Sequence, residues 1–347
     1  MMKKYLITGG SGFFGSILKK YLLNRGNACV SIDMKKDDII HGNLISIVGD
    51  IRNQNTLDRV FCEHAPFDAV FHIAAQLAHV VKNTRFLWES NVDGTENVAR
   101  ICVKHGIKKI VFTSSNCLWG QPFDRWVLES DEPAPIEIYG QSKLEGEKIL
   151  LRYRYQIDSV IFRCPTIVSA GRLGLLGILF EFIDENRIVW VVGSGENKYQ
   201  FIYSDDLADA CLKALDIDRT EVYNIGSDNV RSFREVYGYV IKNAGSKSRV
   251  GSLPKKITLF GMRLMHKLGL SPLGPYQYKM IAESFVFDTH KIKRELAWKP
   301  TKTNEDMLLE AYEYYSVRRD EIQKRKGVSA HRQEAKMGIV RLLKWLS

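Results

Sequence analysis

The chain has 347 residues, of which 45% are apolar and 26% are charged, as expected of a globular protein with a large buried core. Its six cysteines contain no C-x-x-C pair and no His cluster accompanies them, which argues against a disulfide framework or a zinc site and favours a reducing cytoplasm. The net charge is +10, but residues 318–347 hold nine Lys or Arg against three acidic residues, and the body lacks a basic stripe with interleaved aromatics, so nucleic acid is not an expected partner.

Strands and helices alternate through the first half of the sequence. Lys4–Thr8 is an apolar run that ends in a glycine-rich turn, apolar residues then recur at helical spacing as far as Gly26, and Ala28–Asp33 is the next strand. Further strands are predicted at Leu44–Val48, Ala69–Ile73, Lys109–Thr113 and Ser159–Phe162. This alternation predicts an α/β fold of the Rossmann type, a doubly wound parallel sheet with helices on both faces.

The glycines at 9, 10, 12 and 15 stand between a predicted strand and a predicted helix, which is the setting of a dinucleotide-binding turn. Gly9 allows the tight turn, Gly12 lets the backbone approach a pyrophosphate, and Gly15 lets the helix pack closely on the strand. The helix N-terminus adds unpaired N–H groups for the anion. We therefore expect a dinucleotide site at this turn.

Asp33 ends the second predicted strand, where a carboxylate accepts hydrogen bonds from an adenosine ribose and repels a 2′-phosphate. This position favours NAD over NADP, and the nearby Lys35 and Lys36 weaken the preference. Asp50-Ile51, after the third strand, suits the adenine edge or forms an ordinary turn.

The pattern loosens after about residue 165, where short elements alternate with loops that contain Gly and Pro. We assign residues 1–165, with returning segments near 200–226, to an NAD-binding Rossmann domain. Residues 166–315 are then a smaller C-terminal substrate-binding lobe, and residues 316–347 are a basic amphipathic tail.

Tyr139 and Lys143 are four residues apart and share one face of a predicted helix. A phenol with a pKa near ~10 is a poor base at neutral pH. A nearby ammonium and a cationic nicotinamide lower that pKa into a usable range. A hydroxyl of Ser114 or Ser115, at the end of an upstream strand, can hydrogen-bond the substrate oxygen beside the phenol. The pattern predicts oxidation or reduction of an alcohol.

Taken together, these motifs resemble the extended short-chain dehydrogenase/reductase family, in its NAD-dependent epimerase/dehydratase branch (UDP-glucose 4-epimerase-like). The resemblance covers nearly all of residues 3–315. It rests on the glycine turn and on Asp50-Ile51, His72-Ile73-Ala74-Ala75, Asn91–Thr95, Thr113-Ser114-Ser115, Tyr139–Lys143, Arg163-Cys164-Pro165, Asp205-Asp206-Leu207, Asn224–Ser227, Phe287-Asp288 and Glu295–Pro300.

The resemblance implies a role for each matching position. Tyr139 exchanges the substrate proton, Lys143 holds the nicotinamide ribose and tunes the phenol, and Ser115 is the catalytic hydroxyl. The implied cofactor-binding residues are Gly9, Gly12, Phe13, Phe14, Gly15, Asp33, Asp50, Ile51, Ile73, Ala74, Ala75, Asn91, Tyr139, Lys143 and Pro165. The implied substrate residues are Asn116, Thr166 and Tyr199. Arg172, in the apolar stretch that follows, either holds a substrate phosphate or is a solvated loop cation. A homodimer through two helices beside the sheet is also implied.

Asn116-Cys117 stands where the family's hexose dehydratases carry an Asp-Glu pair, so dehydration is not expected. Leu77, Thr166 and Tyr199-Gln200 also depart from the residues of an ordinary UDP-galactose 4-epimerase. Our first hypothesis is an NAD-dependent sugar-nucleotide epimerase. The alternatives are a net NAD(P)-dependent dehydrogenase or reductase of a hydrophobic alcohol (3β-hydroxysteroid dehydrogenase-like), an epimerase of a lipid-linked sugar, and a non-catalytic NAD-binding scaffold. The apolar segment 173–180 suits the two hydrophobic substrates.

The tail carries an apolar helical stripe at Ile339, Leu342, Leu343 and Leu346, with basic residues around it. Such a helix either lies in an anionic membrane interface, which would place the enzyme at the inner face, or docks on the body or a sister subunit. We favour docking, because core-packing stripes are common. No stretch of the chain approaches ~20 apolar residues, so no membrane span is expected.

Overall fold

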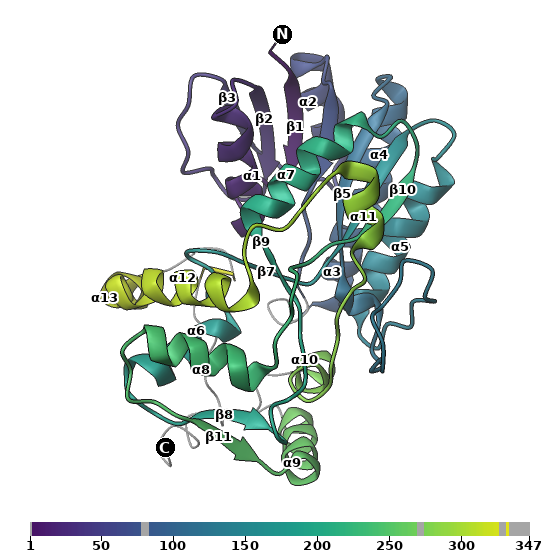
Figure 1. The fold of residues 1–347 in the computed structure, drawn as a ribbon. Helices are drawn as coiled ribbons and strands as arrows, with labels where there is room; N and C mark the ends of the chain where they lie inside the picture. Colours follow the sequence, from purple (N-terminus) through teal and green to yellow (C-terminus); the bar gives the residue numbers. More distant parts are fainter. Residues whose placement is uncertain (1, 78–82, 269–273, 326–330, 333–347) are drawn as a thin grey trace.

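A computed structural model of the chain describes residues 2–77, 83–268, 274–325 and 331–332. Its centre is a seven-stranded, all-parallel sheet in the order β3-β2-β1-β4-β5-β6-β10 (Figure 1). The strands are β1 (Lys4–Thr8), β2 (Ala28–Asp33), β3 (Leu44–Val48), β4 (Ala69–His72), β5 (Lys109–Ser115), β6 (Asp158–Cys164) and β10 (Glu221–Asn224). The predicted α/β fold is confirmed, with β10 as an additional edge strand.

Helices cover both faces of the sheet because the inner strands are apolar on both sides. One core cluster joins one face of the sheet to α1 (Phe13–Leu23), α7 (Ser204–Lys213) and α11 (His290–Leu296). A second cluster joins the other face to α2 (Gln54–His64), α4 (Gly94–Lys104) and α5 (Ile138–Arg152). The short α3 (Thr84–Trp88) lies before α4.

The strand order reverses between β1 and β4, and ligands of such sheets bind outside the carboxyl ends of the strands at that point. Gly9 and Ile73 follow directly on these two strands. The sheet therefore brings the glycine turn and the 73–77 segment to one edge.

A second group of elements, drawn below the sheet in Figure 1, encloses a third apolar core. Two small parallel pairs belong to it, β7 (Thr166–Val168) with β9 (Phe201–Tyr203) and β8 (Val189–Val192) with β11 (Val250–Leu253). Its helices are α6 (Leu175–Asp184), α8 (Phe233–Asn243), α9 (Lys255–Lys267), α10 (Pro275–Met280), α12 (Asn304–Val317) and α13 (Arg319–Lys324). The apolar segment 173–180 thus enters helix α6. The domain boundary at residue 165 stays a prediction.

The first part of the predicted tail packs against the body. Arg319 in α13 pairs with Asp184 at the end of α6 at 2.6 Å, and Ile322 is buried. The carbonyl of His331 accepts a hydrogen bond of 2.7 Å from the amide of Leu173. The amphipathic stretch at 336–346 lies outside the described residues. No helix among the described residues is long and apolar enough to cross a membrane.

Candidate active site

The glycine turn is packed too closely for side chains. Gly9 has φ +74°, and a Cβ there would stand 2.6 Å from the Cα of Ala74. A Cβ on Gly15 would stand 2.2 Å from the Gly9 carbonyl oxygen, so Gly15 packs against the turn itself and not, as predicted, against the strand. Helix α1 follows with Gly12 as its N-cap, which has no side chain to bind the first amides. This backbone cradle fits a pyrophosphate.

Asp33 is held at the mouth of the cradle. Its carboxylate accepts hydrogen bonds from the amides of Ser11 and Lys35, both at 3.0 Å. The amides orient the carboxylate beside the turn, as a ribose-binding role requires. Asp50 is different, because Arg52 occupies its carboxylate at 2.9 and 2.6 Å.

The catalytic candidates converge from β5 and α5. The Lys143 ammonium donates a hydrogen bond of 2.7 Å to the carbonyl of Thr113, and the Ser115 hydroxyl accepts one of 3.1 Å from the amide of Cys117. Burial lowers the pKa of Lys143 to about 8. The Nζ of Lys143 lies 4.5 Å from the ring centre of Phe112.

The Tyr139 phenol behaves differently from the expectation of a lowered pKa. Burial raises its pKa, the Cys117 thiol raises it further, and a hydrogen bond with Ser115 and the charge of Arg172 lower it in part. The protein alone therefore keeps this phenol protonated, and the charge of a bound cationic nicotinamide remains the predicted counterweight.

Two buried polar groups support the site from behind. His72 bridges the hydroxyls of Thr8 and Thr95 at 2.7 and 2.9 Å, and burial lowers its pKa to about 3, so the ring is neutral. Asn91 binds the backbone of Gln76 at 2.7 and 3.0 Å and the Ser142 hydroxyl at 3.0 Å. Asn91 thus connects the segment after β4 to helix α5, and its side-chain amide is already hydrogen-bonded to other residues of this chain.

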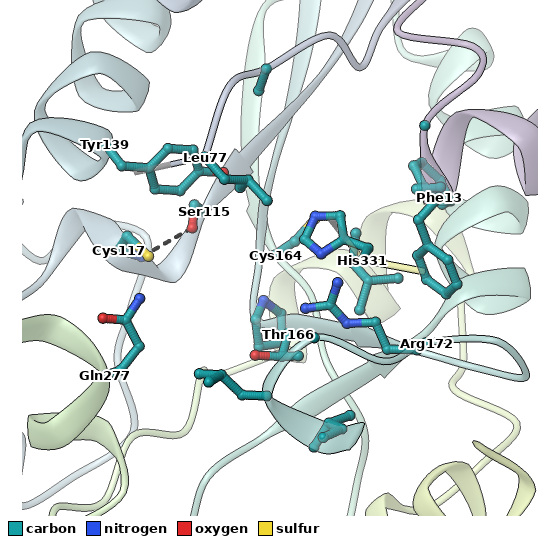
Figure 2. Close-up of a pocket in the computed structure, with 18 of the residues that line it drawn as sticks. Phe13, Leu77, Ser115, Cys117, Tyr139, Cys164, Thr166, Arg172, Gln277 and His331 are labelled. Carbon is teal, nitrogen blue, oxygen red and sulfur yellow. Dashed lines mark hydrogen bonds between the residues drawn. The ribbon is translucent and has the colours of Figure 1, made fainter. Parts of the chain in front are cut away.

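One cavity of about 740 Å³ is lined by the glycine turn, Asp33, Gln76, Ser115, Cys117, Tyr139 and Lys143, whereas His72 and Asn91 are not on its wall. It runs from the glycine turn past Tyr139 into the second group of elements. Figure 2 shows Ser115, Cys117 and Tyr139 on one side, with Phe13, Arg172 and His331 on the other. Predicted residues on its wall are Gly9, Gly12, Phe13, Phe14, Gly15, Asp33, Asp50, Ile51, Ile73, Ala74, Ala75, Ser115, Asn116, Tyr139, Lys143, Pro165, Thr166, Arg172 and Tyr199.

Three of the four predicted substrate residues form one hydrogen-bonded group. The Asn116 amide donates to the Tyr199 hydroxyl at 2.7 Å, and the Thr166 hydroxyl lies 3.3 Å from the same oxygen. Arg172 stands apart, with its guanidinium 5.8 Å from the ring centre of Phe13. Its buried Nε has no partner among the described residues, and burial lowers its pKa to about 10. Arg172 is therefore available to an anion in the cavity.

The far end of the cavity is apolar. It is lined by Leu175, Leu176, Ile178, Leu179, Phe182, Val189, Trp190, Val192, Leu253, Met262, Met280 and Ile281. Segment 173–180 pointed to this wall in the sequence. The other side chains come from α6, β8, β11, α9 and α10, and their apolar character alone fits a core equally well.

Sequence reasoning also missed His331, Glu137 and Tyr276. The ring of His331 lies 6.2 Å from that of Phe13, and the next residue, Arg332, donates to the Ser16 hydroxyl in α1. Glu137 accepts a hydrogen bond of 2.8 Å from the amide of Tyr276 beside the cavity. These contacts join segments more than 130 residues apart, so no local pattern signals them.

Residues 5–226 match the model of the NAD dependent epimerase/dehydratase family. The chain belongs to this family. An uncharacterized protein of Sinorhizobium fredii, y4nG, is 37% identical over 345 residues, which cover 99% of this chain and 86% of that protein. A UDP-glucose 4-epimerase of Halalkalibacterium halodurans is 31% identical over 212 residues, or 58% of this chain and 62% of that protein.

The UDP-glucose 4-epimerase of Thermotoga maritima, solved with UDP-glucose, has the same fold. It matches with a TM-score of 0.74 at 23% identity over 90% of this chain and 98% of that chain. Membership of the family confirms the predicted resemblance, the enzyme class and NAD as the cofactor. The glycine cradle and the oriented Asp33 are the parts of the structure that fit NAD.

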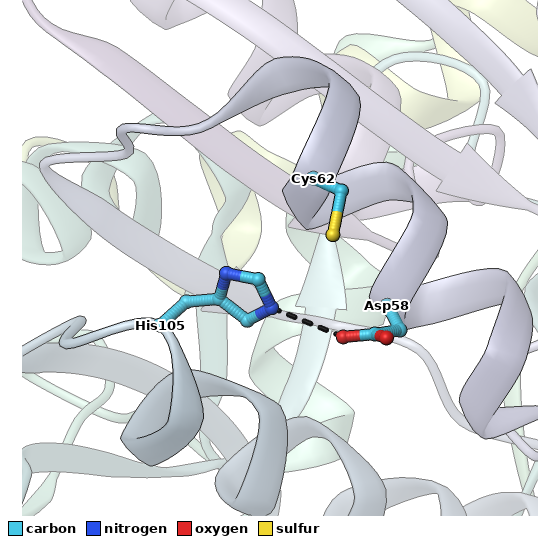
Figure 3. Close-up of side chains that lie close together, drawn as sticks. All are labelled: Asp58, Cys62 and His105. Carbon is cyan, nitrogen blue, oxygen red and sulfur yellow. Dashed lines mark hydrogen bonds and ion pairs between the residues drawn. The ribbon is translucent and has the colours of Figure 1, made fainter.

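A separate cluster lies away from the cavity. Asp58 and Cys62 of α2 meet His105 after α4, with ligand atoms within 4.8 Å of one another (Figure 3). The Asp58 oxygen that binds His105 at 3.1 Å also pairs with Lys104 at 2.6 Å. The charge of the Asp58 carboxylate is thus already balanced by Lys104. We interpret the cluster as an ion pair that joins α2 to α4.

Proposed function

We propose that this enzyme is an epimerase of nucleotide sugars, which oxidises a sugar carbinol to a ketone and reduces it again with the opposite configuration. The observation that carries the proposal is a single cavity that joins the dinucleotide cradle to Ser115, Tyr139 and Lys143. A cavity of about 740 Å³ lies within the size range of small-molecule and cofactor sites.

The chain's own residues move and hold the proton. The Ser115 hydroxyl accepts a hydrogen bond from the Cys117 amide and makes another with the Tyr139 phenol, which places it to bind the substrate oxygen beside that phenol. Tyr139 takes the hydroxyl proton of the sugar and returns it in the reverse step. Lys143 is fixed by the Thr113 carbonyl and has two further N–H donors for a ribose. The glycine cradle and Asp33 would hold NAD, which would supply the hydride acceptor for the oxidation and the hydride donor for the reduction.

Epimerisation is favoured over dehydration by the two residues that follow Ser115. An elimination needs an acid and a base beside the substrate. Asn116 is an amide whose donor is engaged by Tyr199, and burial raises the pKa of the Cys117 thiol to about 12. The similarity to two UDP-glucose 4-epimerases supports a UDP-sugar as the first substrate to test.

The test is turnover of a panel of UDP-sugars by the purified enzyme. We expect interconversion of two epimers without consumption of added NAD, and loss of that activity in Tyr139→Phe. Formation of one NADH for each UDP-sugar consumed would contradict the proposal and identify a net dehydrogenase of that sugar nucleotide instead. Full activity of Tyr139→Phe would remove the phenol from the mechanism.

One observation favours a second candidate, an epimerase of a lipid-linked sugar. The cavity beyond Tyr199 is lined by aliphatic and aromatic side chains, whereas a nucleotide base also needs hydrogen-bond partners. A hydrocarbon chain would be stabilised there by ~25 cal/mol for each Å² removed from water. Interconversion of a polyprenyl-diphosphate sugar, without activity on its UDP counterpart, would decide for this candidate.

A homodimer and a cytoplasmic location stay predictions. The helix that carries Tyr139, α5, packs beside α4 on one face of the sheet, as the predicted dimer surface requires. Light scattering of the purified protein would measure its mass in solution, and a mass equal to one chain would contradict the dimer.

A further inference from the structure

Helix α9 presents an apolar stripe to solvent. Ile257, Phe260, Leu264 and Leu268 are 73%, 70%, 44% and 59% exposed, and α9 has no buried residue. At 100° per residue, the spacing of 3, 4 and 4 places all four on one narrow face. Single exposed apolar residues are normal on protein surfaces, whereas a contiguous cluster of large ones marks an interaction site.

Basic residues flank this stripe. At 100° per residue, Lys256, Arg263 and Lys267 fall together along one side of the stripe. Helix α9 contains no Asp or Glu. Lys255 lies further round and pairs with Glu283 at 2.9 Å. The exposed face is thus both apolar and positively charged, which is the combination that an anionic lipid surface selects.

The other side of α9 belongs to the cavity. Met262 lines the apolar end of the cavity, together with Leu253 just before the helix. In Figure 1, α9 lies at the edge of the molecule farthest from the sheet, beside β11 and α10. One helix therefore separates the apolar end of the cavity from the apolar outer surface.

We propose that helix α9 binds the enzyme to an anionic lipid bilayer. The stripe of Ile257, Phe260, Leu264 and Leu268 lies in the membrane interface, and Lys256, Arg263 and Lys267 contact the lipid headgroups. A bilayer accounts for both the apolar stripe and the basic flank, for which no ion-pair partner is found among the described residues, whereas a second copy of this face would cover the stripe but bring like charges together. Binding through α9 would place the apolar end of the cavity next to the membrane. The inference stands on α9 alone and does not depend on epimerisation.

The test is flotation of the full chain with vesicles of phosphatidylcholine containing 30% phosphatidylglycerol. We expect binding that Ile257→Ser/Phe260→Ser/Leu264→Ser reduces by about tenfold or more. Lys256→Gln/Arg263→Gln/Lys267→Gln should reduce it by about fivefold for each charge removed and abolish its salt dependence. Trp126→Ser/Tyr155→Ser removes two exposed aromatics elsewhere and should leave binding unchanged.

Several outcomes would overturn the proposal. One is absence of flotation of the full chain. Another is flotation that survives both α9 variants and disappears on deletion of residues 333–347, which would assign the membrane contact to the tail. A third is self-association that the stripe variant abolishes, without vesicle binding, which would make the face a contact between copies. Unchanged NAD binding and melting temperature would verify that both variants fold.

Discussion

The ammonium of Lys143 donates a hydrogen bond of 2.7 Å to the carbonyl of Thr113, two residues before Ser115. This bond joins helix α5 to the carboxyl end of β5 and thereby fixes Tyr139, one turn earlier on α5, relative to Ser115. Burial lowers the pKa of Lys143 to about 8, and the charges of Cys164 and Glu147 offset part of that shift. Lys143 therefore positions Tyr139 and brings a positive charge to the site when it is protonated.

Lys143→Met should reduce turnover by ~10²- to 10⁴-fold, the range of a general acid–base contribution. The methionine keeps most of the buried volume and removes the charge. Lys148→Met, on the exposed side of the same helix, is the matched control and should retain activity. Initial rates and circular dichroism of both proteins check this. Equal rates in the two variants would remove Lys143 from the site.

Gly9→Ala should abolish NAD binding and cost more than ~2 kcal/mol of stability. It combines a positive φ with a Cβ 2.6 Å from the Ala74 backbone. Gly26→Ala is the control, since Gly26 has a similar φ of +77° but no atom within 4 Å of the added Cβ. That change should cost about 1 kcal/mol and spare NAD binding. Calorimetric titration with NAD and urea denaturation separate the two effects, and equal results would contradict the close approach.

Asp33→Ser should shift the cofactor preference toward NADP by about tenfold or more, which is ~1.4 kcal/mol. The substitution removes the carboxylate that repels a 2′-phosphate and leaves Lys35 and Lys36 beside the site. The ratio of the dissociation constants for NAD and NADP, measured on both proteins, is the readout. A ratio that does not change would place the adenosine ribose elsewhere.

The buried His72 should make the folding stability of the protein depend on pH in the acidic range. Its pKa is about 3 in the folded protein and 6.5 in the reference state, so between these values only the unfolded chain binds the proton. Stability is therefore lost as pH falls below 6.5, by up to ~1.4 kcal/mol per pH unit. His72→Gln should flatten this slope, and His41→Gln, at an exposed site, should not. Urea denaturation at several pH values between 4 and 6.5 measures it.

Arg172→Gln should raise the KM for a diphosphate-linked sugar about tenfold or more, since charge-assisted hydrogen bonds to phosphate are the strong ones. Arg154→Gln, on the exposed surface, is the control. Steady-state kinetics with both proteins give the KM values. An unchanged KM for Arg172→Gln would mean that its guanidinium serves the protein and not the substrate.

The dinucleotide half was predictable because its signals are local. Gly9, Gly15 and Asp33 lie within one β-α-β unit, so strand and helix periodicity suffices to place them together. Ser115 and Tyr139 needed the resemblance to the family as well. Thr166 followed from the same comparison and Arg172 from the phosphate-binding chemistry of its guanidinium, and both lie on the cavity wall.

The remaining wall depended on tertiary contacts. Met262 on α9 and Trp190 on β8 carry apolar side chains that a sequence cannot assign to a cavity or to a core. His331 reaches Phe13 only because the chain returns to helix α1 near its C-terminus. Gly15 was assigned to the correct helix with the wrong neighbour, because close approach depends on how the turn folds back on itself.

The central claim is that the hydride removed from the sugar returns to the same sugar. The most direct measurement uses a UDP-sugar deuterated at the reacting carbon, incubated with the enzyme and unlabelled NAD. The account predicts an epimer that retains deuterium at that carbon, with no accumulation of NADH at 340 nm. Loss of the deuterium to the NAD pool, with a ketone product that grows in step with NADH, would contradict it.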